Sequence, residues 1–156
     1  MKRVLVVLGI SVAALSSFAL SDWRRGEREP LWPEGKMPDA QAHQIGAMTD
    51  EMKDADFLAS PMRQMPYLEW FEKPAQPNGA CMILVSGGSY QVCCDVWLIK
   101  LWKETFTKLG YQTVNLVYRT PRPAGLAVYQ TAWEDGQRAV RLVRAQAAKR
   151  GFDPEK

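Results

Sequence analysis

The hydrophobic and polar positions divide the chain into an apolar N-terminus, an irregular middle part and an alternating C-terminal part. Residues 1–21 begin with Lys2 and Arg3 and continue as an apolar stretch that ends in Ala19-Leu20-Ser21. This pattern is typical of an export signal, and we expect cleavage before Asp22. An uncleaved membrane anchor is the alternative, although the stretch is short for a span of about 20 apolar residues. We therefore expect a secreted or periplasmic protein without stable membrane association after cleavage.

Residues 22–66 show no sustained periodicity and contain five prolines and three glycines. This frequency of prolines and glycines predicts an extended lead-in segment that wraps a domain and does not form a domain of its own. The only histidine of the chain, His43, lies in this segment. No second histidine, and no cysteine or aspartate at metal-ligand spacing, stands near it. A surface or local hydrogen-bonding role is expected for His43, and neither a metal nor a cofactor is expected.

Residues 67–156 alternate between short apolar runs and segments with helical spacing. An aromatic run over 67–71 predicts a short strand. The continuous apolar run over 81–85 predicts a strand buried on both faces, and the Val- and Tyr-rich run over 112–118 predicts another. The segment 95–109 predicts a helix that ends at a glycine. Its expected apolar face and its stop are Leu98, Trp102, Phe106, Leu109 and Gly110.

The last element, which runs from about residue 131 to Gly151, has the clearest helical spacing. Thr131 and Glu134 have the spacing of a capping box, and Gly151 is placed to end the helix. A glycine inside the apolar face costs helix stability, which suggests close packing of Gly136 against a sheet. The apolar face is expected to consist of Trp133, Gly136, Val140, Val143 and Ala147.

The order strand, helix, strand, helix predicts an α/β fold with a mostly parallel sheet and right-handed crossovers. Open parallel sheets bind ligands at the carboxyl ends of their strands, where Ser86-Gly87-Gly88-Ser89-Tyr90 is expected. Two glycines at this position let backbone N–H groups face a phosphate or a developing oxyanion. The complete phosphate-binding glycine patterns are absent, and a tight structural turn is the alternative.

Ser89 could instead be a nucleophile on a strand–turn–helix elbow. That elbow has the pattern G-x-S-x-G, because small residues must flank its strained turn. The segment Gly87-Gly88-Ser89-Tyr90-Gln91 supplies the first glycine but ends in glutamine. A serine nucleophile also needs a positioned base, for which the chain offers a single histidine. The nucleophile hypothesis for Ser89 is therefore the weaker one.

The three cysteines allow a third hypothesis, a thiol-based redox protein. Cys93 and Cys94 lie near a predicted helix N-terminus, which can lower the pKa of a thiol. Their vicinal spacing differs from C-x-x-C, so burial or a disulfide to a partner outside this segment is the simpler interpretation. Cys81 stands at the opposite end of its predicted strand, about 15 Å away and beyond disulfide reach.

The charge balance does not indicate a nucleic-acid partner. The net charge is +3, and loss of Lys2 and Arg3 with the signal leaves 3 − 2 = +1. Nucleic-acid binders cluster lysines and arginines with interleaved aromatic residues. Here the clustered basic residues fall on one predicted helix, as a solvated face does. They are Arg138, Arg141, Arg144, Lys149 and Arg150.

Several segments together resemble a known family. They are Pro30-Leu31-Trp32-Pro33, Gly87-Gly88-Ser89-Tyr90, Tyr118-Arg119-Thr120-Pro121-Arg122-Pro123, the block from Ala132 to Arg144, and Gly151-Phe152-Asp153-Pro154-Glu155-Lys156. In this order they resemble the N-terminal half of secreted bacterial α/β-hydrolase esterases. That group includes acetyl-xylan-esterase-like enzymes and other carbohydrate-ester hydrolases.

The resemblance implies that residues 67–156 are the N-terminal half of a three-layer α/β-hydrolase sandwich. In that family a strand after the equivalent of Lys156 leads into the G-x-S-x-G elbow, and the acid and histidine follow later. The resemblance assigns the oxyanion hole to backbone N–H groups of Gly87, Gly88 and Ser89, where the family more often has a third glycine in place of Ser89. The expected substrate is a small-molecule or polysaccharide ester such as acetylated xylan, and the chain alone is expected to be inactive.

The sequence also indicates one structural charge pair and one alternative function. Arg119 and Asp135 are expected to form a structural charge pair that ties a strand end to the following helix. A non-catalytic exported module that binds an anion or a glycan through the Gly87-Gly88 loop is the alternative to an esterase.

Overall fold

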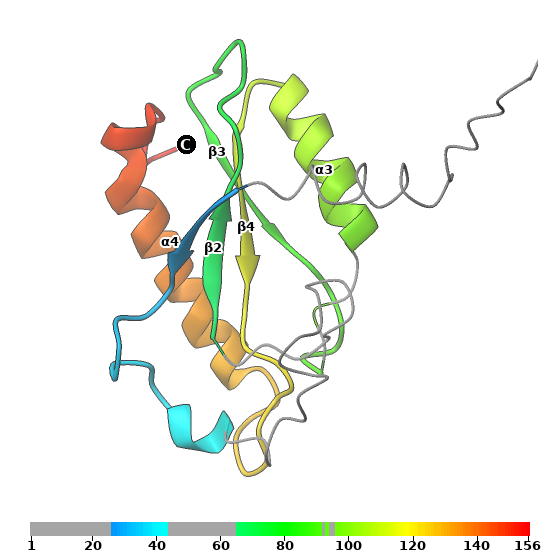
Figure 1. The fold of residues 1–156 in the computed structure, drawn as a ribbon, viewed down its shortest axis with the longest axis vertical. Coiled ribbons are helices and arrows are strands. Elements are labelled where there is room, and N and C mark those ends of the chain that lie inside the picture. The colour runs from blue at the N-terminus through cyan, green and yellow to red at the C-terminus, as the bar shows by residue number, and fades with distance from the viewer. Residues whose placement is uncertain (1–25, 44–64, 92, 94–95) are drawn as a thin grey trace, which may run out of the picture.

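The computed structural model describes residues 26–43, 65–91, 93 and 96–156 (Figure 1). The predicted export signal over residues 1–21 therefore lies outside the described residues. The described elements are β1 (Glu27–Pro30), the 3₁₀ helix η1 (Ala40–His43), β2 (Tyr67–Trp70), β3 (Cys81–Val85), α3 (Val96–Lys108), β4 (Gln112–Val117) and α4 (Gln130–Arg150).

The four described strands form one mixed sheet in the order β1-β2-β4-β3. The β1–β2 and β2–β4 pairs are antiparallel, and the β3–β4 pair is parallel. The expectation of a mostly parallel sheet is thus wrong for these strands. A parallel pair needs a crossover connection, usually a helix, and among the described strands only β3 and β4 are joined through one, α3.

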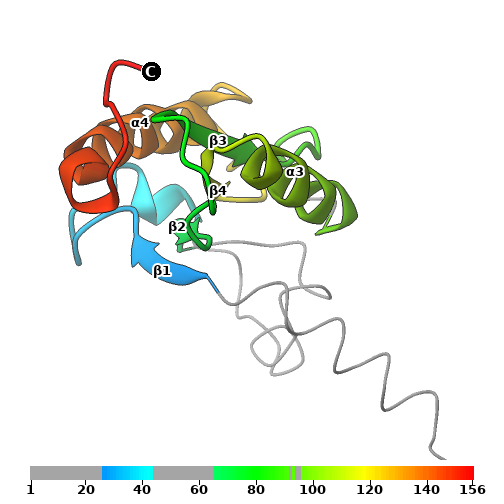
Figure 2. The same cartoon turned by 90° about the horizontal axis from the view of Figure 1, so that it is seen from above.

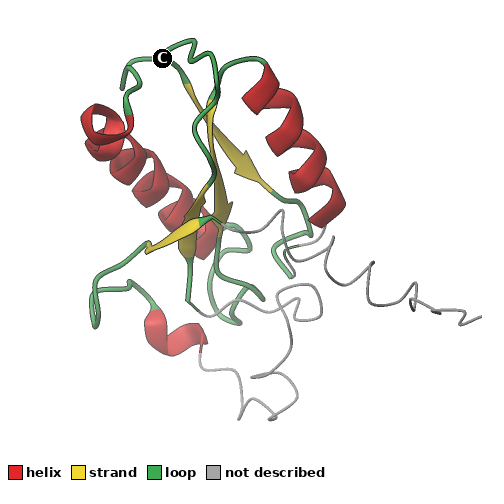
Figure 3. Cartoon of the chain, turned by 45° about the horizontal axis from the view of Figure 1, so that its top comes forward, coloured by secondary structure: helices red, strands yellow, loops and turns green. Residues whose placement is uncertain are grey.

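Helices α3 and α4 cover opposite faces of this sheet (Figures 2 and 3). Because side chains alternate along a strand, Val114 and Leu116 of β4 face α4. On the other side, Leu84 of β3 packs with Phe71 and with Ile99 of α3. These two apolar clusters hold the helices to the sheet.

The two predicted buried strands differ in burial. Every residue of β4 is buried, as predicted, because β4 lies between β2 and β3. The prediction that β3 is buried on both faces is wrong: its first three residues are half-buried and Val85 is 45% exposed. Among the described strands β3 has a neighbour on one side only, so its apolar residues lie at the sheet edge.

The predicted helix is confirmed as α3, but its buried face differs in part from the predicted one. Ile99 is buried, and Trp102 and Phe106 pack against the same cluster, while the side chain of Leu98 lies outside the described residues. The prediction for Leu109 is wrong, because this side chain lies beyond the helix end and is 61% exposed. Gly110 has a φ of +89°, as a glycine at a helix end requires.

Helix α4 confirms Val143 and Ala147 as core residues but corrects the rest of the predicted face. Trp133 and Val140 are exposed, and a Cβ on Gly136 would meet no atom within 4 Å, so Gly136 is not closely packed. The buried stripe includes two polar residues that a hydrophobic pattern cannot indicate. It consists of Thr131, Asp135, Ala139, Val143 and Ala147.

The ends of α4 also differ in how well they were predicted. The capping box is wrong: the helix begins at Gln130, its N-cap residue is Tyr129, and no side chain caps it. Thr131 and Glu134 lie inside the first turns instead. Gly151 ends the helix as predicted, with φ 81° and ψ 39° and its N–H donating to the carbonyl of Ala147 at 2.8 Å.

The described part of the lead-in segment is built into the same fold. Strand β1 pairs with β2, and Leu31, which follows β1, is completely buried in the cluster beneath α4. The Leu31 N–H donates to the carbonyl of Pro66 at 3.0 Å. Residues 26–43 therefore add a strand and core contacts. In the part of the chain that the structure describes, no helix has the length and apolarity needed to cross a membrane.

Replacing Gly110 tests the turn between α3 and β4. A Cβ at this position would lie 2.5 Å from the carbonyl oxygen of Gln76, and the left-handed φ adds strain. We expect Gly110→Ala to lower the free energy of unfolding by about 2–4 kcal/mol in urea denaturation. Gly125→Ala is the control, because Gly125 has a φ of +83° and open space around it. It is expected to cost about 1 kcal/mol, and equal losses would contradict the role of the contact.

Candidate functional site

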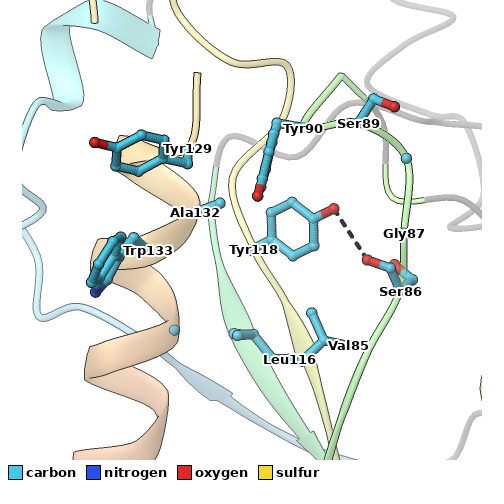
Figure 4. A pocket seen from close by; sticks show the side chains of 12 residues that line it. Val85, Ser86, Gly87, Ser89, Tyr90, Leu116, Tyr118, Tyr129, Ala132 and Trp133 are labelled. Carbon is cyan, nitrogen blue, oxygen red and sulfur yellow. Dashed lines mark hydrogen bonds between the residues drawn. The ribbon is translucent and has the colours of Figure 1, made fainter. Parts of the chain in front are cut away.

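A pocket of about 580 Å³ lies at the carboxyl ends of the parallel strands β3 and β4 (Figure 4). The loop after β3 forms one wall, the end of β4 lies beneath it, and the first turns of α4 form the opposite wall. Its volume lies within the usual range of small-molecule sites. The lining residues are Val85, Ser86, Gly87, Gly88, Ser89, Tyr90, Leu116, Tyr118, Tyr129, Ala132, Trp133 and Gly136.

The loop after β3 adopts a backbone that favours glycine over three successive residues. Gly88, Ser89 and Tyr90 have φ values of +138°, +53° and +62°. Two hydrogen bonds brace the turn: Gln91 N–H donates to Gly88 at 2.9 Å, and Arg122 N–H donates to Tyr90 at 2.7 Å. Left-handed conformations of residues other than glycine are strained, and such strain clusters at functional sites.

The backbone N–H groups of this loop are available to a ligand. Among the described residues, nothing accepts a hydrogen bond from the N–H of Gly87, Gly88 or Ser89, although all three residues line the pocket. Backbone donors that are fixed before a substrate arrives stabilise negative charge that develops in a transition state. The described geometry thus suits the predicted oxyanion-binding role.

Tyr118 supports this loop from below, a role that the sequence analysis missed. Its buried ring lies under the loop, and its hydroxyl donates to the carbonyl oxygen of Ser86 at 3.1 Å (Figure 4). The bond joins the end of β4 to the start of the glycine loop. Tyr118 appears in the sequence as one more strand residue, so only the pairing of β3 with β4 reveals its contact.

The described residues provide no activating base for the side chain of Ser89. None of them hydrogen-bonds its hydroxyl, and a serine nucleophile needs such a base. The backbone of His43 belongs to η1, but its side chain lies outside the described residues. The arrangement therefore favours a role for the Ser89 backbone over the nucleophile hypothesis.

A buried ion pair joins the residue after Tyr118 to α4. Arg119 and Asp135 are both fully buried, and the Arg119 Nε donates to both carboxylate oxygens of Asp135 at 3.0 Å. The Arg119 backbone N–H also donates to Asp135, at 2.9 Å. The residue that follows Tyr118 is thereby fixed to the helix that carries Tyr129, Ala132 and Trp133.

The lead-in segment and α4 provide the remaining hydrogen-bond and ion-pair partners of these two charges. The Trp32 indole N–H donates to Asp135 at 2.8 Å, and the Arg119 guanidinium donates to the carbonyl of Pro38. Arg119 also pairs with Glu134 at 2.9 Å. Buried charges require such partners, since desolvation otherwise outweighs their attraction. The pairing of Arg119 with Asp135 was predicted from the sequence, whereas Glu134 was not. The contacts of Trp32 and Pro38 join segments far apart in the chain, so no local pattern indicates them.

The two described cysteines, Cys81 and Cys93, form no disulfide. Cys93 donates through Sγ to the carbonyl of Tyr118 at 3.5 Å, and Cys94 lies outside the described residues. Cys81 is not part of a disulfide. Within the described ranges, no group of three histidine, cysteine, aspartate or glutamate residues could hold a metal ion.

Solved structures of two bacterial hydrolases resemble the chain, whereas no family model and no curated protein matches it. An acetyl ester-xyloside bifunctional hydrolase from Caldicellulosiruptor lactoaceticus shares 25% identity and a TM-score of 0.53 over 83% of this chain. A thermophilic esterase from the planctomycete Thermogutta terrifontis shares 19% identity over 86% of this chain. Its TM-scores are 0.55 in the propionate-bound form and 0.56 in the native form.

The chain has an α/β-hydrolase-like fold. This conclusion rests on the mixed sheet with helices and on structural neighbours that are bacterial esterases. The chain spans 40% of the length of the Caldicellulosiruptor hydrolase, and 40% and 39% of the Thermogutta esterase in its two forms.

A double-mutant cycle tests the Arg119–Asp135 pair. Arg119→Met and Asp135→Asn are each expected to lower the free energy of unfolding by about 3–5 kcal/mol, because each leaves a buried charge without its partner. The double variant is expected to lose about 1–3 kcal/mol less than the sum. Urea denaturation gives the free energy of unfolding of the parent chain, the two single variants and the double variant. The Arg150–Glu27 pair, in which Glu27 is 62% exposed, is the control and should couple by under about 1 kcal/mol. Additive losses at Arg119 and Asp135 would contradict the coupling.

Cys81 is expected to be a slow-reacting thiol. Burial raises its pKa from the usual 9.0 to about 12, and the charge of Arg150 opposes this only in part. With Cys93→Ala and Cys94→Ala in place, Ellman's reagent at pH 8 should react slowly with the folded protein and rapidly in urea. The unfolded thiol ionises near pH 9 and the folded thiol near pH 12. Stability from the protonated thiol is therefore complete below pH 9 and falls between pH 9 and 12. Equal rates with and without urea would contradict this burial.

Proposed function

We propose that this chain forms the oxyanion side of a serine-type carboxylic ester hydrolase. The observation that carries the proposal is the glycine loop, whose N–H groups have no described acceptor, at the carboxyl end of β3 in a pocket. Ligands bind at this edge in open α/β sheets. Donors of this kind are each worth about 3–4 kcal/mol in the transition state of acyl transfer.

The nucleophile, the acid and the catalytic histidine belong, in this proposal, to a following part of the same polypeptide. Two observations support the idea: the chain spans about 40% of the length of its structural neighbours, and β3 lies at an edge of the described sheet. A strand and helix added there would complete the three-layer sandwich. They would also cover Val85, Trp133 and Val140, which are exposed.

The proposed substrates are carbohydrate esters such as acetylated xylan, and the proposed location is the cell exterior or the periplasm. The Caldicellulosiruptor neighbour, described as an acetyl ester-xyloside bifunctional hydrolase, supports the substrate class. The pattern of residues 1–21 supports export. Neither proposal requires a cofactor, because acyl transfer through serine uses side chains and backbone donors alone.

An assay of ester hydrolysis by the 156-residue chain tests whether the nucleophile lies outside this chain. We expect no turnover of p-nitrophenyl acetate above the buffer rate, because the described residues provide no base for a serine. Ser89→Ala is the control, and it should leave this background unchanged. Turnover that disappears in Ser89→Ala would replace the proposal with the Ser89 nucleophile hypothesis.

A chain extended by the coding sequence after the Lys156 codon tests the oxyanion role directly. The proposal expects an in-frame G-x-S-x-G within about a dozen residues and esterase activity in the extended chain. There, Gly88→Ala should lower kcat by about 10²–10³-fold, because a side chain at φ +138° displaces the donors. Ser89→Gly should keep the activity, since glycine adopts φ +53° without strain. Equal activity of Gly88→Ala, with folding verified by its Tm, would contradict the role of the loop.

A further inference from the structure

Tyr90 places a polar group in the pocket that the oxyanion role does not use. Its side chain lines the pocket and is 39% exposed. Figure 4 shows the ring extending from the glycine loop into the pocket, with its hydroxyl directed toward Tyr118 and Ala132. That hydroxyl hydrogen-bonds to no described residue. Since a phenol hydroxyl can both donate and accept a hydrogen bond, it can bind a polar atom of a ligand.

The backbone of Tyr90 is held in the conformation that sends the ring into the pocket. Its φ of +62° lies in the left-handed region, which is strained for a tyrosine. The N–H of Arg122 donates to the carbonyl oxygen of Tyr90 at 2.7 Å and thereby joins the loop to the segment after β4. Such strain persists only where the surrounding structure enforces it. The direction of the ring is therefore set by the backbone of the loop.

The N–H groups and the hydroxyl of this loop serve two different parts of a ligand. The N–H groups belong to the backbone from Gly87 to Ser89, whereas the Tyr90 hydroxyl stands at the far end of its ring, on the side of Ala132 and away from Gly87 (Figure 4). An ester whose carbonyl oxygen is bound by the N–H groups thus presents another of its atoms to Tyr90. An ester of a simple alcohol has only carbon at that position, whereas a partly esterified sugar or polyol carries hydroxyls on the carbons next to the ester.

We infer that Tyr90 is a specificity-determining residue whose hydroxyl binds a free hydroxyl group next to the ester in the alcohol part of the substrate. The inference rests on the proposed function and adds the residue that distinguishes esters of sugars and polyols from esters of simple alcohols. The hydroxyl belongs to the alcohol part because the acetyl group of the proposed substrates ends in a methyl group. The strand and helix proposed at the β3 edge would cover Val85, Trp133 and Val140, none of which this contact needs.

Two acetate esters of equal size test the role of Tyr90 in the extended chain. Ethylene glycol monoacetate and propyl acetate differ only in a terminal hydroxyl in place of a methyl group. Tyr90→Phe keeps the ring and removes the hydroxyl, so it should lower the ratio of kcat/KM for the glycol ester to kcat/KM for the propyl ester by about two- to tenfold. The intrinsic reactivities of the two esters cancel when variant and parent are compared. Hydrolysis of propyl acetate should change little, which shows that the oxyanion loop is intact.

Tyr111→Phe is the matched control for the loss of a tyrosine hydroxyl. Tyr111 packs edge-on against Phe106, with ring centroids 5.6 Å apart, and does not line the pocket. This variant should leave the ratio of the two esters unchanged, and circular dichroism melting verifies that both variants fold. Equal ratios in the parent and in Tyr90→Phe, or a ratio that Tyr111→Phe lowers equally, would overturn the inference.

Binding to the 156-residue chain separates this inference from the esterase proposal, because binding requires no nucleophile. With isotope-labelled tyrosine rings, the NMR signal that is missing in Tyr90→Phe belongs to Tyr90. Ethylene glycol monoacetate at millimolar concentration should shift this signal more than propyl acetate does. A Tyr90 signal that responds to both esters alike, or to neither, would overturn the inference.

The two proposals therefore fail in different ways. A hydroxyl-dependent shift of the Tyr90 signal, together with an extended chain that hydrolyses no ester, would support the Tyr90 contact and reject the esterase. An extended chain that hydrolyses both esters in the same ratio with and without the Tyr90 hydroxyl would support the esterase and reject the contact.

Discussion

The buried contact between the Arg119 guanidinium and the Asp135 carboxylate is the interaction on which the pocket depends. It joins the residue after Tyr118 to the second turn of α4, and Trp32 adds a third segment to the same carboxylate. One pair of charges therefore connects the lead-in, the sheet and the helix that forms a pocket wall. Since each charge is stable in the interior only with its partner, these segments are held in one relative position.

That position gives the pocket two unlike walls. On one side the chain follows β3 into a strained loop in which Ser89 and Tyr90 have positive φ values, and Tyr118 holds its start. On the other side α4 presents aromatic rings. Strain in the loop is tolerated because β3 and β4 are paired in parallel and end together. This pairing places Tyr118 beneath the start of the loop. Backbone donors that are fixed in advance stabilise developing negative charge, and largely apolar walls are typical of small-molecule pockets.

Local patterns predicted the elements well and their faces less well. The strands over 81–85 and 112–117 and both long helices lie where spacing placed them, because apolar periodicity and the stop signals Gly110 and Gly151 act over a few residues. The predicted face of α4 failed in part, since hydrophobicity cannot identify a buried Asp135. The capping box at Thr131 failed because the helix begins one residue earlier, at Gln130, so that Thr131 lies inside the first turn.

The sequence by itself determined which segments form strands and helices, where glycines end them, and that a glycine loop follows β3. It also indicated the resemblance to esterases and the pairing of Arg119 with Asp135. Only the tertiary structure decided that the described sheet is mixed, that β1 and Trp32 of the lead-in belong to the fold, and that β3 lies at the edge among the described strands. The reason is physical: periodicity reports on neighbours within a few residues, whereas strand order and buried charge networks depend on contacts between residues up to about a hundred positions apart.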